Sequence, residues 1–265
     1  MSSRSKPVVP GVFVLGMHRS GTSAVTQTLA QTGLTMCPPA DLMPAGADNP
    51  AGFCECMAVV ILNDAILRSV GGSWLSPPPL DEFRRGLQRW EPVARTILSW
   101  LHEPSPWLIK DPRLCLTLPF WRGIVTPDPA ITLVLRHPVA VADSLIARDG
   151  LSMSEALTLW EQYLRAALVN CEGLRTVVVS YEELIEQPST WAAQQHEFLD
   201  GLGVSSLPGA GALSAVDASL QHWKERGVAR LTNGQRELWE LAVSLLGIHT
   251  AFPSCRAVLN APLGG

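Results

Sequence analysis

The sequence lacks any run of apolar residues as long as the roughly 18 that a membrane-spanning helix needs, and its first residues show no signal-peptide pattern. It also lacks a strong charge, because 20 Lys and Arg stand against 24 Asp and Glu in 265 residues, a net charge of −4. We therefore expect a cytoplasmic protein with no membrane and no nucleic acid as a partner. Any bound polyanion has to be held by a local pocket.

The cysteines form no C-x-x-C pair and have no His at ligand spacing, so neither a zinc site nor a disulfide framework is expected. Cys54 and Cys56 flank Glu55, a residue that becomes important below. The sequence also shows no Asp after an apolar strand in the manner of the magnesium ligand of nucleotide hydrolases. We expect no metal cofactor.

What the sequence does contain is ample apolar material, with 47% apolar residues and nine Trp. We expect one domain over residues 1–265, with loose ends at 1–7 and 261–265. Short apolar runs predict four strands, each followed directly by polar residues, and amphipathic segments between them predict helices. This alternation indicates an α/β fold of P-loop type, a mostly parallel sheet with helices on both faces and ligands at the carboxyl ends of the strands.

The expected elements follow from local signals. The four strands are expected at 12–15, 107–109, 131–135 and 176–179. Helices are expected at 24–34, 57–70, 81–101, 139–148, 154–171 and 232–246, with Asp81 as the cap of the third. The loop over 35–56 is long enough to be functional, and residues 204–229 are a candidate cover over the site.

The segment from Val12 to Ser23 is the main functional signal. An apolar strand is followed by a loop bracketed by Gly16 and Gly21, and a helix comes next. Loop N–H groups and a helix N-terminus then converge on one point, which suits a phosphate. The Gly spacing is that of a P-loop, but Thr22 replaces the usual Lys and the cation is Arg19. We predict that the anion is bound by Arg19, Ser20, Gly21, Thr22 and Ser23.

A second constellation combines Arg136, Ser144 and Arg148. Arg136 follows a strand, and Ser144 and Arg148 are four residues apart on the next helix, so they share a face. Two guanidiniums and a hydroxyl near a helix start suit a second phosphate, because Arg makes bidentate contacts to it. By itself the segment is also compatible with an ordinary solvated helix face.

Together these motifs resemble sulfotransferases that use 3′-phosphoadenosine 5′-phosphosulfate (PAPS). The run from His18 to Ser23 is similar to their 5′-phosphosulfate loop, and Arg136 with Ser144 eight residues later is similar to their 3′-phosphate site. An additional Arg four residues after that Ser, here Arg148, is a feature in which the chain resembles the tyrosylprotein sulfotransferases and their bacterial relatives in particular. The resembling segments, in the same order, extend over about residues 12–200.

Two further segments carry the resemblance. Lys110-Asp111-Pro112 is similar to the same branch, and Tyr181-Glu182-Glu183-Leu184 resembles the segment whose Tyr contacts adenine in many members. In two respects the chain departs from the cytosolic small-molecule branch. Pro112 stands where those enzymes have a catalytic His, and their Arg-Lys-Gly stretch is missing unless Lys224–Gly227 is a loose substitute.

Glu55 is the candidate base in place of that His. It ends a long loop just before a helix, roughly where the tyrosylprotein branch carries a Glu, and a carboxylate there can take the proton of an acceptor hydroxyl. The alternative is a Glu that only complements the helix dipole. His18 and Asp111 are weaker candidates, and Asp111 is expected to pair with Arg113 or Lys110.

The resemblance implies an enzyme that moves a sulfuryl group from PAPS to a hydroxyl, with Glu55 as base and Lys110 neutralising the bridging oxygen. A P-loop kinase or NTPase is the first alternative, disfavoured by the missing Walker A Lys. A non-catalytic nucleotide-binding protein is the second. The acceptor is expected to be a small molecule, but the sequence does not separate a phenol, an alkyl alcohol, a sugar or a peptide Tyr, and it leaves the oligomeric state open.

Overall fold

The computed structural model describes residues 11–46, 49, 52–84, 86–101, 106–204 and 231–259. The expected loose ends at 1–7 and 261–265 lie outside these residues. So does Lys224–Gly227, and almost all of the expected cover over 204–229.

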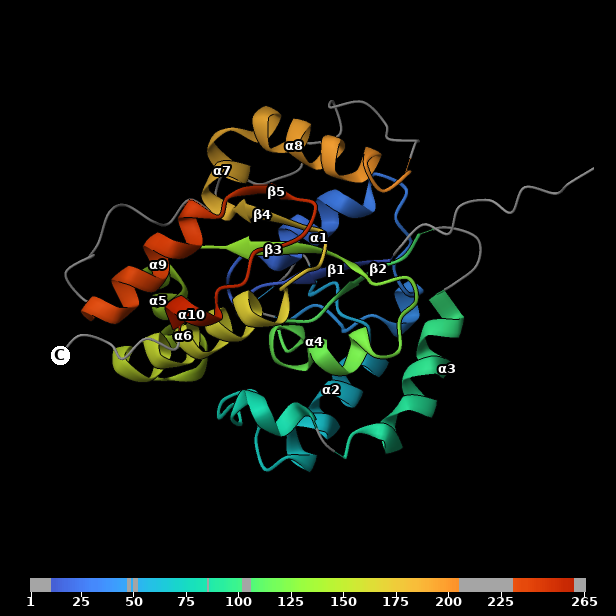
Figure 1. Cartoon of the computed structure of the whole chain (residues 1–265), viewed down its shortest axis with the longest axis horizontal. Coiled ribbons are helices and arrows are strands. Elements are labelled where there is room, and N and C mark those ends of the chain that lie inside the picture. The colour runs from blue at the N-terminus through green and yellow to red at the C-terminus, as the bar shows by residue number, and fades with distance from the viewer. Residues whose placement is uncertain are drawn as a thin grey trace, which may run out of the picture.

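In the described part of the chain, five strands form one sheet in the order β2-β1-β3-β4-β5 (Figure 1). The strands are β1 (Val12–Leu15), β2 (Leu108–Lys110), β3 (Ala130–Leu135), β4 (Thr176–Ser180) and β5 (Gly247–His249). The first four are parallel, which confirms the predicted mostly parallel sheet. The fifth pairs antiparallel with β4 and was not predicted, since three residues carry too little pattern.

The side chains of the interior strand β1, which lies between β2 and β3, alternate between two cores. Val12 and Val14 pack in a cluster with residues of α1 (Thr22–Ala30), α7 (Tyr181–Glu186) and α8 (Pro188–Asp200). Phe13 and Leu15 pack in a second cluster on the opposite face. All four side chains are fully buried, as expected for a strand covered on both sides, and Figure 1 shows α7 and α8 above the sheet.

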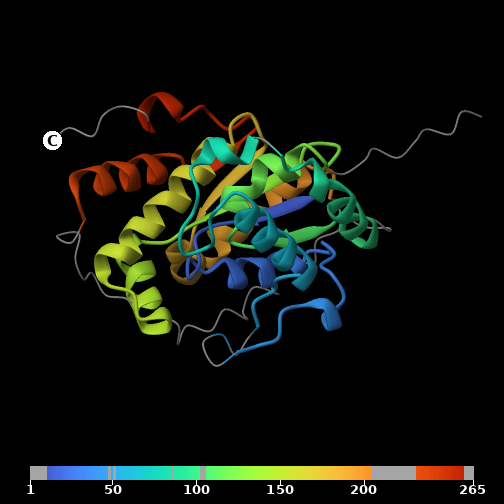
Figure 2. The ribbon, with the colours of Figure 1, turned by 90° about the horizontal axis from the view of Figure 1, so that it is seen from below.

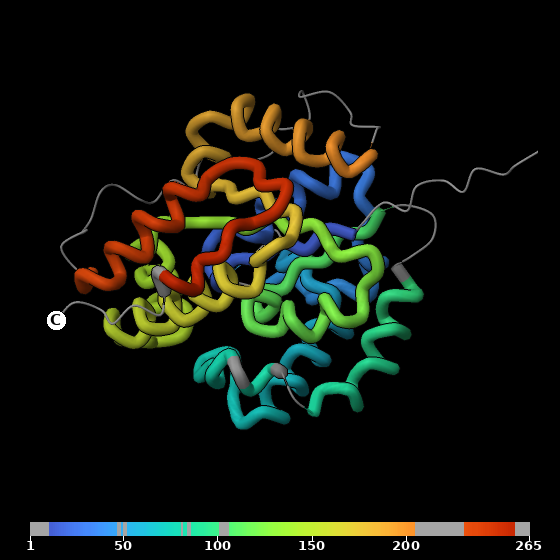
Figure 3. The backbone as a smooth tube through the Cα atoms, viewed as in Figure 1, coloured from blue at the N-terminus to red at the C-terminus, as the bar shows by residue number. Residues whose placement is uncertain are grey.

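The second cluster is covered by a larger group of helices, which Figure 2 shows from below. They are α2 (Met57–Ser69), α3 (Glu91–Leu101), α4 (Leu114–Arg122), α5 (Pro138–Asp149), α6 (Met153–Asn170) and α9 (Asn233–Ser244). The predicted helices on both faces are therefore confirmed. The C-terminal segment, red in Figure 3, runs from α9 through β5 to the short helix α10 (Arg256–Leu259).

Local capping signals explain why several helices begin where they were expected. Pro138 occupies the first turn of α5, and the ring of His137 accepts a hydrogen bond from the N–H of Val139. Ser152 and Glu155 form a reciprocal capping box at α6, and Thr232 and Gln235 form another at α9. Among the described helices, none combines the length and apolar character that a membrane span requires.

The prediction of one helix over 81–101 is wrong. The structure has 3-10 turns at Leu80–Arg84 and Gln88–Trp90, and a regular helix begins only at Glu91. Gly86 lies between the two turns with φ of +71°, a left-handed conformation that ends helical geometry. Asp81 is therefore not the cap of α3. Helices α4 and α8 were not predicted, and α4 contains Pro119, which a sequence pattern reads as a break.

Candidate functional site

The loop between β1 and α1 has a backbone that its two glycines make possible. Gly16 and Gly21 have φ of +152° and +83°, and Arg19 between them is also left-handed at +69°. A Cβ on Gly16 would lie 2.7 Å from the Thr22 methyl group and 2.8 Å from the Val134 carbonyl oxygen. Such a strained, over-determined backbone is typical of functional loops.

Tyr181, at the start of α7, packs directly on this loop. A Cβ added to Gly21 would lie 2.1 Å from the Tyr181 ring, so only glycine permits this contact. On the ring lies the guanidinium of Arg136, with its central carbon 4.8 Å from the ring centre. Arg136 Nη1 also donates a hydrogen bond of 2.8 Å to the Arg19 carbonyl oxygen. The carboxyl ends of β3 and β4 therefore meet the loop, as the sheet order requires.

Arg19 links the loop to the second predicted constellation. Its Nε donates a hydrogen bond of 2.8 Å to Oγ of Ser144, a residue 125 positions away on α5. The structure thus brings Arg19, Arg136, Ser144 and Tyr181 together. Ser20 and Thr22 are buried within the loop and its first helical turn.

Arg148 is oriented differently from Arg136. It shares a face of α5 with Ser144, but its guanidinium lies 5.2 Å over the ring of Trp74 and pairs with Asp149 at 2.8 Å. Of the three residues predicted to bind a second phosphate, Arg136 and Ser144 therefore lie together at the loop, and Arg148 contacts Trp74 and Asp149 instead.

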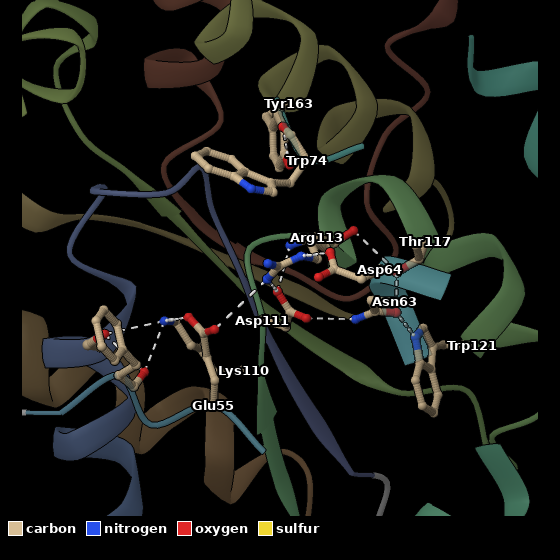
Figure 4. Close-up of polar contacts among 12 residues, drawn as sticks. Glu55, Asn63, Asp64, Trp74, Lys110, Asp111, Arg113, Thr117, Trp121 and Tyr163 are labelled. Atoms are coloured by element: carbon tan, nitrogen blue, oxygen red, sulfur yellow. Dashed lines mark hydrogen bonds and ion pairs between the residues drawn. The ribbon is translucent and has the colours of Figure 1, made fainter. Parts of the chain in front are cut away.

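The carboxyl end of β2 brings the two predicted catalytic residues together (Figure 4). Lys110 Nζ donates hydrogen bonds to Glu55 Oε1 at 2.6 Å, to the Phe53 carbonyl oxygen at 3.0 Å and to Ser23 Oγ at 3.3 Å. Ser23 in turn donates to the same Phe53 carbonyl at 3.1 Å. The start of α1, the end of the long loop and β2 therefore converge on one ammonium group.

Glu55 precedes α2 as predicted, yet it is a buried partner in an ion pair and not a surface cap. Its side chain is 6% exposed and that of Lys110 is 3% exposed. Burial raises the pKa of the Glu55 carboxyl above its ordinary value, Lys110 and Arg113 oppose the shift, and Asp111 adds to it. A carboxylate with a raised pKa is a stronger proton acceptor than an ordinary glutamate, which suits a general base.

Behind Glu55 lies a network of buried polar groups. Arg113 donates from Nε to Asp64 Oδ1 at 2.6 Å and from Nη1 to Asp111 Oδ1 at 3.0 Å. Asp111 Oδ2 accepts a hydrogen bond from Asn63 Nδ2 at 2.9 Å. Asn63 Oδ1 accepts from Thr117 at 2.9 Å and from the indole N–H of Trp121 at 2.8 Å. The expected pairing of Asp111 with Arg113 is confirmed.

The position of Asp111 corrects the statement that no Asp follows an apolar strand, since it comes directly after β2, next to β1 in the sheet. Its oxygens are engaged by Arg113 and Asn63. Within the described ranges, no three His, Cys, Asp or Glu side chains are grouped as metal ligands would be. The absence of a metal stays a prediction.

His18 packs against two aromatic side chains at the site. Its ring lies 4.7 Å from the Trp74 ring and 5.8 Å from that of Tyr163. Burial lowers the pKa of His18 well below its ordinary value, and nearby cations, Arg113 first among them, lower it further. A neutral His18 surrounded by cations is consistent with a site built for anions.

Sequence reasoning missed two residues of this site, namely Asn63 and Asp64. Asn63 and Asp64 interrupt the apolar helix Met57–Ser69, and Asn63 is fully buried. A polar pair inside an apolar helix is the signal that could have pointed to them, because a buried amide has to find partners. Trp74 lies in an irregular segment, and no local pattern indicated its contacts with His18 and Arg148.

The fold and the site define an α/β protein that presents a glycine-bracketed loop and several cations at the carboxyl edge of a parallel sheet. The model of the sulfotransferase family matches residues 10–202, so the chain belongs to this family, and sulfuryl transfer is its general chemistry. No curated protein sequence matches the chain.

Two solved structures are similar in fold. The sulfotransferase domain from the curacin biosynthetic pathway is 17% identical, with a TM-score of 0.57, covering 88% of this chain and 98% of that domain. The sulfotransferase domain from the Synechococcus PCC 7002 olefin synthase is 19% identical, with a TM-score of 0.52, covering 92% and 96%. At this identity the likeness concerns the fold, and it confirms the α/β architecture.

Proposed function

We propose that this protein transfers a sulfuryl group from PAPS to a hydroxyl group of a small-molecule acceptor. The observation that carries the proposal is the buried pair of Lys110 and Glu55, 2.6 Å apart, beside Ser23 of the anion-binding loop. A cation for the leaving oxygen and a carboxylate for the acceptor proton are the two groups that this transfer needs. A cytoplasmic location is part of the same proposal.

The residues around the loop are suited to hold the nucleotide donor. Arg19, Ser20, Gly21, Thr22 and Ser23 would bind the 5′-phosphosulfate through backbone N–H groups, hydroxyls and one guanidinium.

The other end of the donor has its own partners. Arg136, Ser144 and Arg148 would bind the 3′-phosphate, and Tyr181 would contact the adenine ring. The hydrogen bond between Arg19 and Ser144 supports this assignment, since it joins the two phosphate sites.

In the reaction, the acceptor oxygen forms a bond to sulfur while the bond from sulfur to the bridging oxygen breaks. Glu55 takes the proton of the acceptor hydroxyl, and Lys110 stabilises the charge on the bridging oxygen, which leaves with 3′-phosphoadenosine 5′-phosphate. In the present structure Lys110 and Glu55 neutralise one another. Lys110 therefore has to turn from Glu55 to the donor, which frees the carboxylate to act as a base.

Calorimetry tests the donor. We expect 3′-phosphoadenosine 5′-phosphate to bind tightly with or without Mg²⁺, and ATP to bind weakly under both conditions. Adenosine 5′-phosphate is the matched ligand that lacks the 3′ group. Tight, magnesium-dependent binding of ATP alone would instead favour a kinase or NTPase. Transfer is then tested by incubating the protein with PAPS and either a phenol or an alkyl alcohol. The acceptor that gives faster release of 3′-phosphoadenosine 5′-phosphate indicates the acceptor class.

A further inference from the structure

Arg113 faces three carboxylates from three different parts of the chain (Figure 4). It follows β2, Asp64 lies on α2, and Glu55 ends the long loop before that helix. Its guanidinium is bound to Asp64 at 2.6 Å and to Asp111 at 3.0 Å, and Nη1 lies 4.0 Å from Glu55 Oε2. Arg113 thus approaches the oxygen of Glu55 that Lys110 does not contact.

The surrounding network fixes this guanidinium in place. Asp111 is fully buried, and its Oδ1 accepts from both the backbone N–H and Nη1 of Arg113. Asn63 holds the other Asp111 oxygen and is itself held by Trp121 and a threonine hydroxyl. Buried, satisfied networks of this kind are rigid, because any displacement leaves a polar group without a partner.

Glu55 needs such a fixed partner when Lys110 leaves it. The proposed function requires Lys110 to turn to the bridging oxygen, which removes the 2.6 Å contact from a buried carboxylate. A buried carboxylate without a cation takes up a proton, and a protonated Glu55 is no longer a base. Within the described part of the chain, Arg113 is the remaining cation that forms an ion pair with Glu55.

We propose that Arg113 is a positioning residue for the base: held by Asp64 and Asp111, it keeps the Glu55 carboxylate in place and ionised while Lys110 serves the donor. The inference rests on the proposed function, because it presupposes that Glu55 accepts the proton. In this role Arg113 acts on the reaction only through Glu55. Its effect is expected in the pH dependence of turnover rather than in nucleotide binding.

The charged groups around Glu55 determine the direction of that effect. Lys110 and Arg113 lower the pKa of Glu55, whereas burial and Asp111 raise it. Of the two cysteines that flank Glu55, Cys54 is neutral, since burial raises the pKa of its thiol, whereas a hydrogen bond with Cys37 lowers the pKa of Cys56 to about 6. Burial by itself would lower the pKa of Arg113, but Asp111 and Asp64 raise it on balance, so its charge is constant over the working pH range.

Two substitutions should therefore move the acid limb of the pH profile in opposite directions. Arg113→Gln removes a cation beside Glu55, and we expect the limb to shift by about one unit to higher pH. Arg113→Lys keeps the charge and should retain most of the parent profile. Asp64→Asn frees the guanidinium from its competing partner, and the limb should then shift to lower pH.

Arg68→Gln is the matched control on α2. Arg68 contacts Asp64 at 3.7 Å and is 73% exposed, so its loss should leave the limb in place. All variants are measured as turnover against pH at saturating PAPS and acceptor, with melting temperatures on the same preparations. A uniform loss of turnover in Arg113→Gln, with an unmoved limb, would assign Arg113 a structural role only and overturn the inference.

If Arg113→Gln does not fold, Asp64→Asn tests the role of Arg113 instead. The Asp64 side chain is 24% exposed, so this substitution is expected to disturb folding less. An acid limb that stays at the parent position in Asp64→Asn contradicts the inference. Glu55→Gln distinguishes a failure of the proposed base from a failure of the proposed role of Arg113. Turnover close to the parent rate in Glu55→Gln removes the proposed base itself, whereas a large loss there with unmoved limbs in the other variants removes only the role of Arg113.

Discussion

Lys110 Nζ lies 2.6 Å from Glu55 Oε1, and the two side chains are 3% and 6% exposed. Removing either partner of such a pair leaves an uncompensated charge in a buried site, which is strongly unfavourable. The pair therefore stabilises the empty site and, under the proposed function, has to open when the donor binds. The behaviour of substitutions at this pair and in its surroundings follows from that relationship.

Glu55→Gln keeps the shape of the side chain and an oxygen that can accept from Lys110, but it removes the base. We expect turnover to fall by roughly 10²–10⁴ without a loss of nucleotide affinity, because the donor no longer competes with the Glu55 carboxylate for Lys110. The loss should be smaller for nitrophenols, whose protons leave more easily. Initial rates and calorimetry on one preparation provide the measurement.

Glu155→Ala is a suitable comparison, because Glu155 is an exposed carboxylate that serves only the capping box of α6. It should lower the melting temperature and leave turnover intact. If Glu55→Gln behaves like Glu155→Ala, with a lower melting temperature and near-parent transfer, Glu55 is a structural residue and His18 or Asp111 is the next candidate base.

The pH profile of the parent enzyme follows from the raised pKa of Glu55. The base acts only when ionised, so turnover should be lost as the pH falls through a value above the ordinary 4.5 of a glutamate. The pH dependence of kcat/KM, which reports the groups of the free enzyme, checks this, and the acid limb should be absent from Glu55→Gln. A parent profile that is flat down to pH 4.5 contradicts the prediction.

The same shift has a consequence for stability with a defined sign. The folded protein binds the Glu55 proton more tightly than the unfolded chain does, so the contribution of this group to stability is fully present below the unfolded pKa. It is lost as the pH rises through the folded pKa. The difference in free energy of unfolding between parent and Glu55→Gln should change in this window, as followed by urea denaturation at several pH values.

Arg136→Ala should weaken binding of 3′-phosphoadenosine 5′-phosphate far more than binding of adenosine 5′-phosphate. The lost charge-assisted contact costs about 1.5–3 kcal/mol. Arg148→Ala should show the same selectivity with a smaller loss, because Arg148 first has to leave Asp149 and Trp74. Ser144→Ala should follow with the smallest effect. Calorimetry with the two nucleotides measures the ratio.

Arg122→Ala is the control for these variants, since Arg122 on α4 pairs with Asp128, and it should bind both nucleotides as the parent does. Equal weakening of the two nucleotides by Arg136→Ala would place the role of Arg136 on the 5′ side or in the fold. Its contact with the Arg19 carbonyl makes that outcome a real alternative.

Asn63→Ala tests the buried network. The substitution leaves Asp111, Thr117 and Trp121 without their Asn63 hydrogen bonds. We expect a loss of about 3 kcal/mol in the free energy of unfolding, because Asp111 and Trp121 each keep a buried group unsatisfied at roughly 1–3 kcal/mol, while Thr117 can still donate to the Arg113 carbonyl oxygen. Asn170→Ala, which removes one partly buried hydrogen bond to Cys115, should cost only about 1 kcal/mol. Similar losses for both would show that the network relaxes easily.

The sequence by itself determined the α/β fold, the four parallel strands and the family. These features follow from patterns of neighbouring residues in the sequence. The short, fully apolar run Val12–Leu15 is typical of a strand covered on both faces, and Gly16 and Gly21 permit the loop that follows it. Parallel strands also deliver the residues after them to one edge, which is why Lys110, Arg136 and Tyr181 could be assigned to a common site from the sequence. Their chemical roles stay predictions.

Only the tertiary structure decided which of these residues contact one another. Glu55 and Lys110 are 55 positions apart in the sequence, and Arg19 and Ser144 are 125 apart. No local sequence pattern could therefore predict either contact. The same holds for the position of Arg148 on Trp74 and for the three carboxylates around Arg113. Such contacts depend on how helices pack on the sheet and on which buried polar groups find partners, and these are properties of the whole fold.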